Sequence, residues 1–315
     1  MKQVLFLFLF LPSVTVAQKI DHMASFRNIN SDSYFRFNYD NDFFAATDKD
    51  YTQGYNLELV APVLENNPLN LLFLAPKGSF YKFGLSIEHL GFTPQQYQRP
   101  EIQFGDRPFA AAIMLKSFLV ATDTVKKSRA TSSFSLGVIG PGAFGREMQE
   151  GIHKLTGNKI PLGWRNQIKN DIVLNYNLIY EKNFWSYTHL FSLNTVTNAQ
   201  LGTLFTHIST GINSTLGLIN SPFTADKKGF RVYLYAQPSL KFVGYNATLQ
   251  GSMFNKDSPY TISANAVERF TGQFDFGLIL QTRAMYFEYT RSLITREFEF
   301  GHSAAWGGVN FGFTF

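Results

Sequence analysis

The chain contains no cysteine and little charge, and each of these shortages excludes a class of protein. Without cysteine among its 315 residues, it can form no disulfide framework, thiolate metal site or cysteine nucleophile. Only 16% of residues are charged, against about 25% in an average chain, whereas 16% are aromatic. Disorder requires the opposite balance. The 28 basic and 23 acidic residues form no Lys/Arg run, so we expect no nucleic-acid partner.

Long apolar runs are also missing, except at the start of the chain. Lys2 precedes an unbroken apolar stretch over residues 4–11, and small or tolerated residues follow up to Ala17. This layout is typical of a secretory signal peptide that is too short to span a bilayer, and we expect residues 1–17 to be removed. An exported, aromatic-rich chain with no later apolar run is either secreted or an outer-membrane β-barrel.

Alternation at period two distinguishes between these two classes. At the end of the chain, apolar or small residues alternate with small or polar ones, and the apolar series is Ala305, Gly307, Val309, Phe311, Phe313 and Phe315. Residues 172–180 and 285–289 repeat the pattern. It indicates strands with one face toward lipid and one toward a lumen. The terminal Phe resembles the C-terminal signature of bacterial outer-membrane proteins, whereas a soluble sandwich would carry charge on its outward face.

About twelve segments are long enough to cross a membrane as strands, and bacterial barrels have an even number. They are 33–41, 52–62, 80–91, 108–121, 130–140, 171–182, 183–196, 201–213, 229–245, 267–281, 283–297 and 303–315. No internal repeat or credible domain linker interrupts them. The sequence therefore predicts an all-β fold, a transmembrane antiparallel β-barrel of about 12 strands, as a single domain over residues 18–315.

Between the fifth and sixth expected strands, the period changes to that of a short helix. An apolar stripe is formed by Phe144, Met148, Ile152 and Leu155, and Gly157 follows as a stop signal. Gln149 and His153 lie together, roughly a quarter-turn from the centre of the stripe. We expect the stripe to pack on the barrel wall while these two side chains face sideways. The alternative is a helix that plugs or stiffens the mouth, with His153 only capping it.

Topology brings several polar residues to one rim of the expected barrel. If both termini lie in the periplasm, the connections from odd to even strands face the exterior. The polar residues gathered there are Asp40, Asn41, Asp42, Thr52, Gln149 and His153. Oxygen ligands suit a hard cation such as calcium, and imidazole suits general-base catalysis near neutral pH. Taken alone, an Asp-Asn-Asp run is equally typical of a simple turn.

Several motifs occur in a fixed order through the first half of the chain. They are Tyr39-Asp40-Asn41-Asp42-Phe43, Thr47-Asp48-Lys49-Asp50-Tyr51-Thr52-Gln53-Gly54, Gly105-Asp106-Arg107-Pro108-Phe109-Ala110, Gly137-Val138-Ile139-Gly140-Pro141, Glu147 with Gln149 and His153, and Gly163-Trp164 with Gln167, Ile168 and Asn170. Together they resemble the outer-membrane lipid A 3′-O-deacylase family. The matches span residues 34–180, whereas the C-terminal half agrees chiefly in barrel character.

The resemblance implies a twelve-stranded barrel with an active site between its wall and a helix from an exterior loop. The site residues that it implies are Asn41, Asp42, Thr52, Gln149 and His153. A lysine that the family carries after the third strand has no clear match, because the loop over residues 92–99 offers only Arg99 as a cation. Either Arg99 substitutes for that lysine or recognition of the lipid phosphate differs.

The implied activity is that of a carboxylic ester hydrolase, which removes a 3′-linked acyl (acyloxyacyl) chain from lipid A. The implied location is the exterior face of a Gram-negative outer membrane, where lipopolysaccharide and other membrane lipids are the partners. As in calcium-dependent phospholipase A2, His153 would activate water, and Asp42 would help to hold Ca²⁺ at the oxyanion. Asn41, Thr52 and Gln149 would complete the oxyanion site or orient groups, with roles that the sequence does not separate.

Two alternatives remain at this point. His207 and Ser209 place a base and a hydroxyl on one face of a strand, as in serine-dependent outer-membrane acyl hydrolases. Loss of activity in Ser209→Ala but not in His153→Ala would favour that enzyme. A non-enzymatic, porin-like barrel is the other alternative, and solute flux through liposomes with the lipid left intact would favour it.

Overall fold

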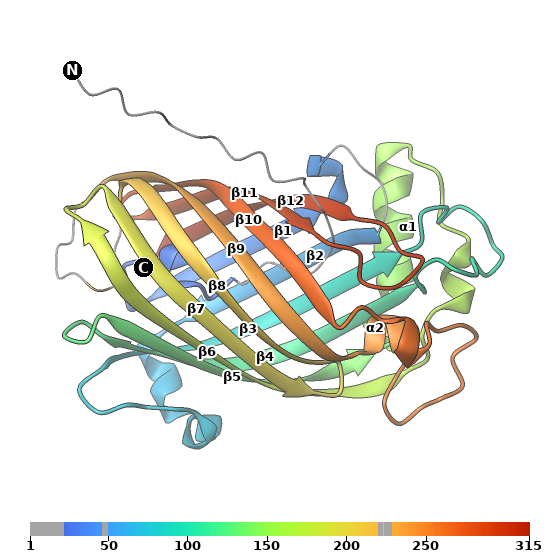
Figure 1. Cartoon of the computed structure of the whole chain (residues 1–315), viewed down its shortest axis with the longest axis horizontal. Coiled ribbons are helices and arrows are strands. Elements are labelled where there is room, and N and C mark those ends of the chain that lie inside the picture. Colours follow the sequence, from blue (N-terminus) through green and yellow to red (C-terminus); the bar gives the residue numbers. More distant parts are fainter. Residues whose placement is uncertain (1–21, 46–49, 220–222, 224–228) are drawn as a thin grey trace, which may run out of the picture.

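The protein is described here by a computed structural model that covers residues 22–45, 50–219, 223 and 229–315, without the side chains of residues 43, 45 and 50–52. The expected leader at residues 1–17 lies outside this range. Twelve antiparallel strands form a closed barrel in which each strand pairs with the next and β1 pairs with β12 (Figure 1). The predicted fold class is confirmed.

The strands follow the predicted segments closely. They are β1 (Tyr34–Asn41), β2 (Asp50–Val60), β3 (Phe80–Thr93), β4 (Ala110–Asp123), β5 (Ser128–Ile139), β6 (Asp171–Tyr187), β7 (Phe191–Gly202), β8 (Phe205–Leu218), β9 (Arg231–Asn246), β10 (Phe270–Gln281), β11 (Met285–Ile294) and β12 (Ala304–Thr314). The expected boundary at residue 183 is wrong, because β6 continues through a bulge between Asn183 and Trp185 and stays paired with β7.

Helical segments occupy the segment before β1 and several connections between the strands. They are α1 (Gly145–Thr156), α2 (Ala247–Gln250) and the 3-10 turns η1 (Ser25–Arg27), η2 (Asp42–Ala45), η3 (Pro62–Asn66), η4 (Pro68–Leu72), η5 (Pro141–Ala143), η6 (Gly163–Asn166) and η7 (Ala264–Ala266). The helix predicted after the fifth strand is confirmed as α1. In the described part of the chain, no helix is both long enough and apolar enough to cross a bilayer.

The wall has an apolar outer face and a polar inner face, as the period-two pattern predicts. In β2, Leu57 and Leu59 are exposed on the outside, whereas Asn56 and Glu58 are buried. Closure of the sheet gives every strand two hydrogen-bonded neighbours, which an environment of lipid requires. The outer face is therefore the lipid-facing one.

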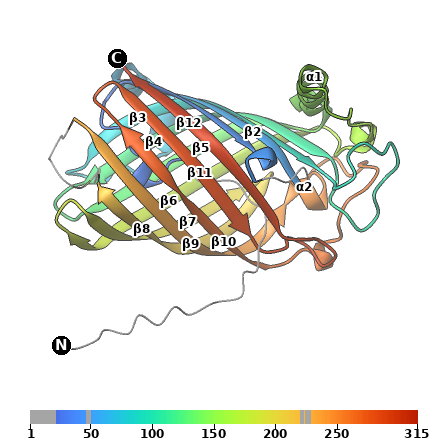
Figure 2. The same ribbon diagram turned by 90° about the horizontal axis from the view of Figure 1, so that it is seen from above.

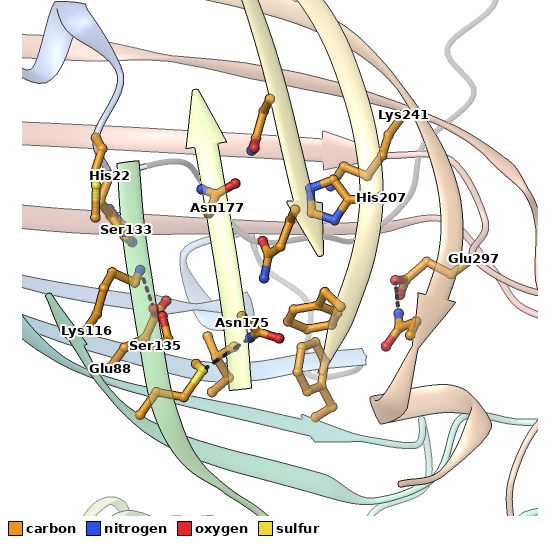
Figure 3. Close-up of a pocket in the computed structure, with 18 residues that line it drawn as sticks. His22, Glu88, Lys116, Ser133, Ser135, Asn175, Asn177, His207, Lys241 and Glu297 are labelled. Carbon is orange, nitrogen blue, oxygen red and sulfur yellow. Dashed lines mark hydrogen bonds and ion pairs between the residues drawn. The ribbon is translucent and has the colours of Figure 1, made fainter. Parts of the chain in front are cut away.

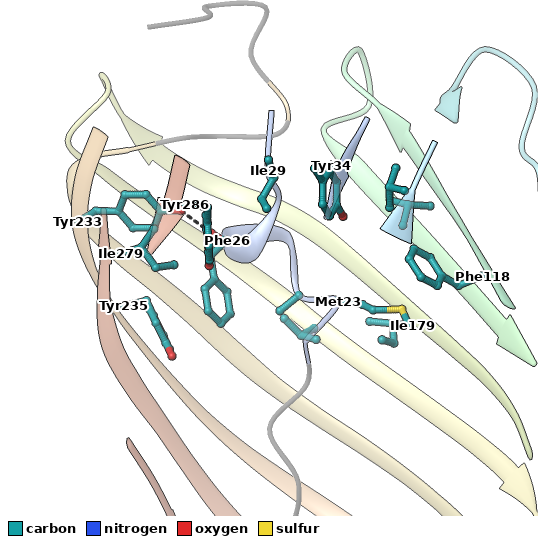
Figure 4. Close-up of a cluster of buried hydrophobic side chains, with 14 residues drawn as sticks. Met23, Phe26, Ile29, Tyr34, Phe118, Ile179, Tyr233, Tyr235, Ile279 and Tyr286 are labelled. Atoms are coloured by element: carbon teal, nitrogen blue, oxygen red, sulfur yellow. Dashed lines mark hydrogen bonds between the residues drawn. The ribbon is translucent and has the colours of Figure 1, made fainter. Parts of the chain in front are cut away.

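Part of the lumen is filled by the segment that precedes β1 (Figure 4). Met23, Phe26 and Ile29 of this segment are buried among side chains of the inner wall. Arg27 pairs with Glu288 of β11 at 2.8 Å, and both side chains are almost fully buried. The segment thus connects to the barrel through both apolar packing and a buried ion pair.

The two ends of the barrel differ in their connections. The long connections over residues 94–109, 140–170 and 247–269 share one end with α1, which we call the α1 end. β1 begins and β12 finishes at the opposite end, which we call the terminal end. A view turned by 90° places α1 outside the ring of strands, beside the wall (Figure 2).

Candidate active site at the outer wall

Helix α1 turns Gln149 and His153 toward the protein and exposes both ends of its apolar stripe, whereas its charged residues Arg146, Glu147 and Lys154 are exposed. Gly145, Gln149 and His153 are the buried residues of the helix, whereas Leu155 is 90% exposed and Phe144 is exposed as well. The expectation that the stripe packs on the wall is therefore wrong. Beside a lipid-facing surface, apolar side chains can point outward without cost, whereas polar side chains need partners within the protein.

Close approach of the helix to the wall depends on Gly145. A Cβ atom at this position would lie 2.3 Å from Cβ of Ala111 on β4 and 2.8 Å from the ring of Trp164. At the other end, Gly157 adopts φ +71°, and its N–H donates to the carbonyl oxygen of His153. Glycine tolerates this left-handed conformation, which is a common helix end. The glycines therefore set the position of Gln149 and His153 relative to the wall.

Gln149 is oriented by a buried tryptophan. Nε1 of Trp164 donates to Oε1 of Gln149 at 2.6 Å, and Trp164 packs against Phe109, Ala111 and Ala143. Because the amide oxygen accepts this bond, the amide nitrogen is the group left to donate. Nε2 of Gln149 is buried and has no hydrogen-bond partner within the described residues. A buried donor of this kind is costly unless a ligand uses it.

His153 is fixed in a single tautomer by its main-chain partner. Its Nδ1 lies 2.5 Å from the carbonyl oxygen of Lys159. A carbonyl oxygen can only accept, so Nδ1 carries the proton and Nε2 keeps a basic lone pair. The ring of Tyr97 meets the imidazole edge-to-face, with centroids 5.3 Å apart. The imidazole is therefore held in place with its basic nitrogen defined.

A polar and aromatic strip crosses the lipid-facing side of the wall next to this helix. The rings of Tyr39 and Tyr55 stack with centroids 5.0 Å apart, and Tyr55 lies 6.2 Å from the ring of His89. Nε2 of His89 bonds to the carbonyl oxygen of Ala143, just before α1, at 2.9 Å. At the other end of the strip, Nδ2 of Asn41 donates to the hydroxyl of Tyr39 at 3.0 Å. These contacts connect the end of β1 with η5, which directly precedes α1.

Tyr39 and Tyr55 are members of the candidate site that the sequence pattern alone did not indicate. They are direct partners in the β1–β2 register, and Tyr55 is in turn the partner of His89 on β3. One signal was present, since His89 interrupts the outward apolar series of Leu85 and Ile87. Without the strand register, however, the three rings cannot be recognised as neighbours.

The remaining predicted site residues lie at the same end of the barrel. Asn41 ends β1, and the side chain of Asp42, the first residue of η2, is buried. Thr52 lies at the bulge where β2 shifts register against β3, and its side chain is outside the described residues. The side chain of Arg99 is exposed, and nothing in the structure connects it with Gln149 or His153.

The residues at the rim offer a limited set of donors for the expected calcium ion. In the part of the chain that is described, no group of three or more His, Cys, Asp or Glu side chains could hold a metal. Asp42 and Asn41 nevertheless supply a carboxylate and an amide oxygen, which are calcium-type donors, and calcium completes its shell with main-chain oxygens and water. The rim thus fits a hard cation held partly by Asp42, and it does not fit a preformed zinc site.

The serine-based alternative places its two residues on the opposite face of the wall. His207 lines a lumen cavity of about 900 Å³ together with Lys241 and Lys116 (Figure 3). Ser209 lines a neighbouring cavity of the lumen, and Ile208 between them is exposed on the outside. A lipid in the membrane cannot reach this pair, so the geometry does not favour that alternative.

The fold and the site together define a class of protein. It is an outer-membrane type of β-barrel with a buried Gln and His pair at the lipid-facing side of its wall. The chain belongs to the family described as "Outer membrane protein LpxR", whose model matches residues 4–315. This finding confirms the resemblance seen in the sequence motifs.

Comparison with solved structures supports the same architecture. The fold is similar to that of LpxR from Salmonella typhimurium, with a TM-score of 0.73 and 20% identity over 90% of this chain and 100% of that chain. The β domain of the Bordetella autotransporter Brka gives a TM-score of 0.47 at 7% identity, with 90% and 98% of the two chains covered, and indicates nothing further. No curated protein sequence matches the chain.

Proposed function

We propose that this protein is a lipid A deacylase, an ester hydrolase that removes the 3′-linked acyl or acyloxyacyl chain. Membership of the LpxR family supports this function. The position of the site supports a membrane lipid as substrate, because Gln149 and His153 adjoin the lipid-facing side of the wall and not the lumen. If the terminal end faces the periplasm, the α1 end meets the outer leaflet, where lipopolysaccharide is the principal lipid.

The observation that carries the proposal is the fixed tautomer of His153. With Nδ1–H bonded to Lys159, Nε2 is the atom that takes a proton from water. The water oxygen then bonds to the ester carbonyl carbon. When the carbon–oxygen bond to the sugar breaks, the alkoxide takes the proton back from the imidazolium, and the fatty acid leaves as the second product.

Gln149 is suited to stabilise the charge that develops during this attack. Its Nε2 is a buried donor, and Trp164 holds the amide so that this nitrogen, and not the oxygen, is presented. Preorganised donors of this type contribute much of the rate of acyl transfer, and loss of one costs about 10²–10³ in kcat.

The cation would be held by Asp42 together with the amide oxygen of Asn41. Bound there, calcium would supply Lewis-acid polarisation of the ester carbonyl. The burial of Asp42 keeps its carboxylate in a fixed position at the rim, and the bond from Nδ2 of Asn41 to the hydroxyl of Tyr39 holds the neighbouring amide at the same rim.

The apolar stripe of α1 gives the acyl chains a place to lie. Phe144 and Leu155 are exposed and Met148 and Ile152 are half-buried, so the helix presents an apolar surface beside the Gln149 and His153 pair. Acyl chains along this surface would place their ester linkage at the polar rim. The stripe thus serves the substrate and not the packing of the helix.

The proposal is tested by comparing lipid A from cells that express the protein with lipid A from cells that lack it. We expect the mass to fall by one 3′-linked chain together with any secondary chain that it carries. Unchanged acylation across several lipid A types would disprove the assignment. Loss of a chain from phospholipid would keep the hydrolase and change its substrate.

A further inference from the structure

The connection between β2 and β3 is an unusual feature at the terminal end, far from the candidate site. It spans residues 61–79 and contains η3 and η4, which lie outside the barrel at the end opposite α1 (Figure 1). Turns at this end of outer-membrane barrels are ordinarily short. A long connection folded back on the wall therefore needs a physical explanation.

The underside of this connection is bonded to the wall. Nδ2 of Asn67 donates to Oγ of Ser117 on β4 at 3.0 Å, and the N–H of Leu74 donates to Oγ of Ser132 on β5 at 3.1 Å. Both serines lie at outward-facing positions yet are buried. A bare hydroxyl is unfavourable against lipid, so these serines fit a wall that is permanently covered by the connection. Phe73 adds apolar packing against the same strands.

The connection exposes several large apolar side chains beside the polar residues Glu65, Asn66 and Lys77. Leu71 is 90% exposed. The other large apolar side chains exposed on it are Val63, Leu72 and Leu74. Such a patch would be costly in water, but it continues the lipid-facing belt of the wall, where Tyr81 is also exposed. The physical environment that satisfies both sides is the edge of a bilayer leaflet.

An open groove of about 850 Å³ runs between the connection and the wall. Its lining combines an apolar floor, formed by Tyr81, Phe83 and Leu119, with a polar rim that includes Asn66, Asn70 and the carboxylate of Glu65. Exposed lysines lie at the same end, namely Lys77 after η4 and Lys127 in the turn between β4 and β5, where Lys126 pairs with Asp123 at 3.2 Å. Strand pairing places the start of β3 next to this turn.

We infer that the β2–β3 connection is embedded in the leaflet at the terminal end, and that its groove holds an acyl chain of an anionic glycerophospholipid. The apolar floor matches the chain, the asparagine rim matches the ester region, and the lysines match the phosphate. The inference is independent of the chemistry at α1.

The absence of native cysteine allows the depth of the segment to be measured directly. Leu71→Cys and Val125→Cys would each carry a nitroxide label, in vesicles of phosphatidylethanolamine and phosphatidylglycerol. Both native side chains are 90% exposed, so the two positions are matched in accessibility. We expect the label at residue 71 to collide with oxygen severalfold more than with a water-soluble nickel chelate, and the label at residue 125 to show the reverse. Preferential collision of both labels with nickel would overturn the embedding.

Occupancy of the groove is tested with phosphatidylglycerol that bears a diazirine in its acyl chain, in the same vesicles. We expect crosslinks to peptides that contain Tyr81 and Leu119. Ala75 lines the groove and is exposed, so Ala75→Trp should fill the groove and remove those crosslinks. The control variant Ala75→Ser should keep them. Crosslinks at Leu57, which lies outside the groove, should persist in both variants. If groove crosslinks are absent in the wild type or survive Ala75→Trp, the groove is not a lipid site.

Discussion

At the scale of single residues, Gln149 and His153 each have one polar side-chain atom bonded within the protein and a second one to which the proposed mechanism assigns a role. Nδ1 of His153 bonds to the carbonyl oxygen of Lys159, so Nε2 is the nitrogen that the proposed mechanism uses as the base. Oε1 of Gln149 is used by Trp164, which defines Nε2 as the donor. The hydrogen bond to one atom of each side chain therefore fixes whether the other atom can donate or accept a proton.

This arrangement predicts that Trp164→Phe slows catalysis by releasing Gln149. A single hydrogen bond is worth about 1 kcal/mol, so we expect kcat to fall about fivefold with KM nearly unchanged, measured on purified folded protein. The same substitution in a Gln149→Ala background should have no further effect, because the two act as one unit. Trp185→Phe, at an exposed position on β6, is the control. An equal loss from Trp164→Phe in both backgrounds would indicate a purely structural role.

Asp42 provides a second prediction at this scale. If its carboxylate holds a hard cation, a calcium-selective chelator should abolish activity and added Ca²⁺ should restore it. Asp42→Asn keeps the size of the side chain but removes its charge, so we expect low activity that Ca²⁺ no longer rescues. Deacylation rates before and after chelation give the answer. Full activity after thorough chelation would exclude a metal-assisted reaction.

At the scale of elements, the contact between α1 and the wall is the critical one. Gly145→Ala would place a Cβ atom 2.3 Å from Ala111, so the helix must move outward and carry Gln149 and His153 with it. A displacement of this order costs about 10² in rate.

Gly151→Ala is the matched control in the same helix, because a Cβ atom there meets nothing within 4 Å. This change should preserve the deacylation rate and stabilise the helix by about 0.5–1 kcal/mol. The comparison uses initial rates on lipid A, with folding checked by circular dichroism. Equal activity of the two variants would mean that the helix position does not matter.

The secondary structure could be predicted from the sequence, because alternation at period two specifies strands and the 3.6-residue period specifies α1. The direction in which α1 faces could not, since periodicity gives the angle between Gln149 and the apolar stripe but not which side meets protein. In a lipid environment the usual rule is reversed. The Tyr39, Tyr55 and His89 strip needed the pairing register, which the sequence does not provide.

At the scale of the whole molecule, the barrel separates a lipid-facing site from an occupied lumen. The segment before β1 is held from several strands, since Arg27 pairs with Glu288 on β11 and Arg129 on β5 donates to the carbonyl oxygen of Met23. These bonds join opposite parts of the ring. The segment therefore contributes to closure of the barrel as well as filling it.

We predict that Glu288→Gln destabilises the barrel strongly, because it leaves the Arg27 charge buried without its carboxylate. Removing one partner of a buried ion pair costs about 3–5 kcal/mol. Glu268→Gln is the control, since its partner Arg296 is 56% exposed and exposed pairs contribute less than about 1 kcal/mol. To measure the difference, samples in SDS are incubated at a series of temperatures and run on gels without boiling, and the temperature at which the folded band disappears is compared. Equal temperatures for the two variants would show that the pair is dispensable.

The central claim is that His153 activates water for hydrolysis of the 3′-linked ester of lipid A. The most direct measurement is mass spectrometry of lipid A incubated in detergent and Ca²⁺ with purified wild type or His153→Ala. The wild type should release the 3′-linked chain, whereas the variant should fold and insert normally yet leave lipid A intact, because the substitution removes the base without touching strand pairing. Deacylation by His153→Ala at the wild-type rate would contradict the account.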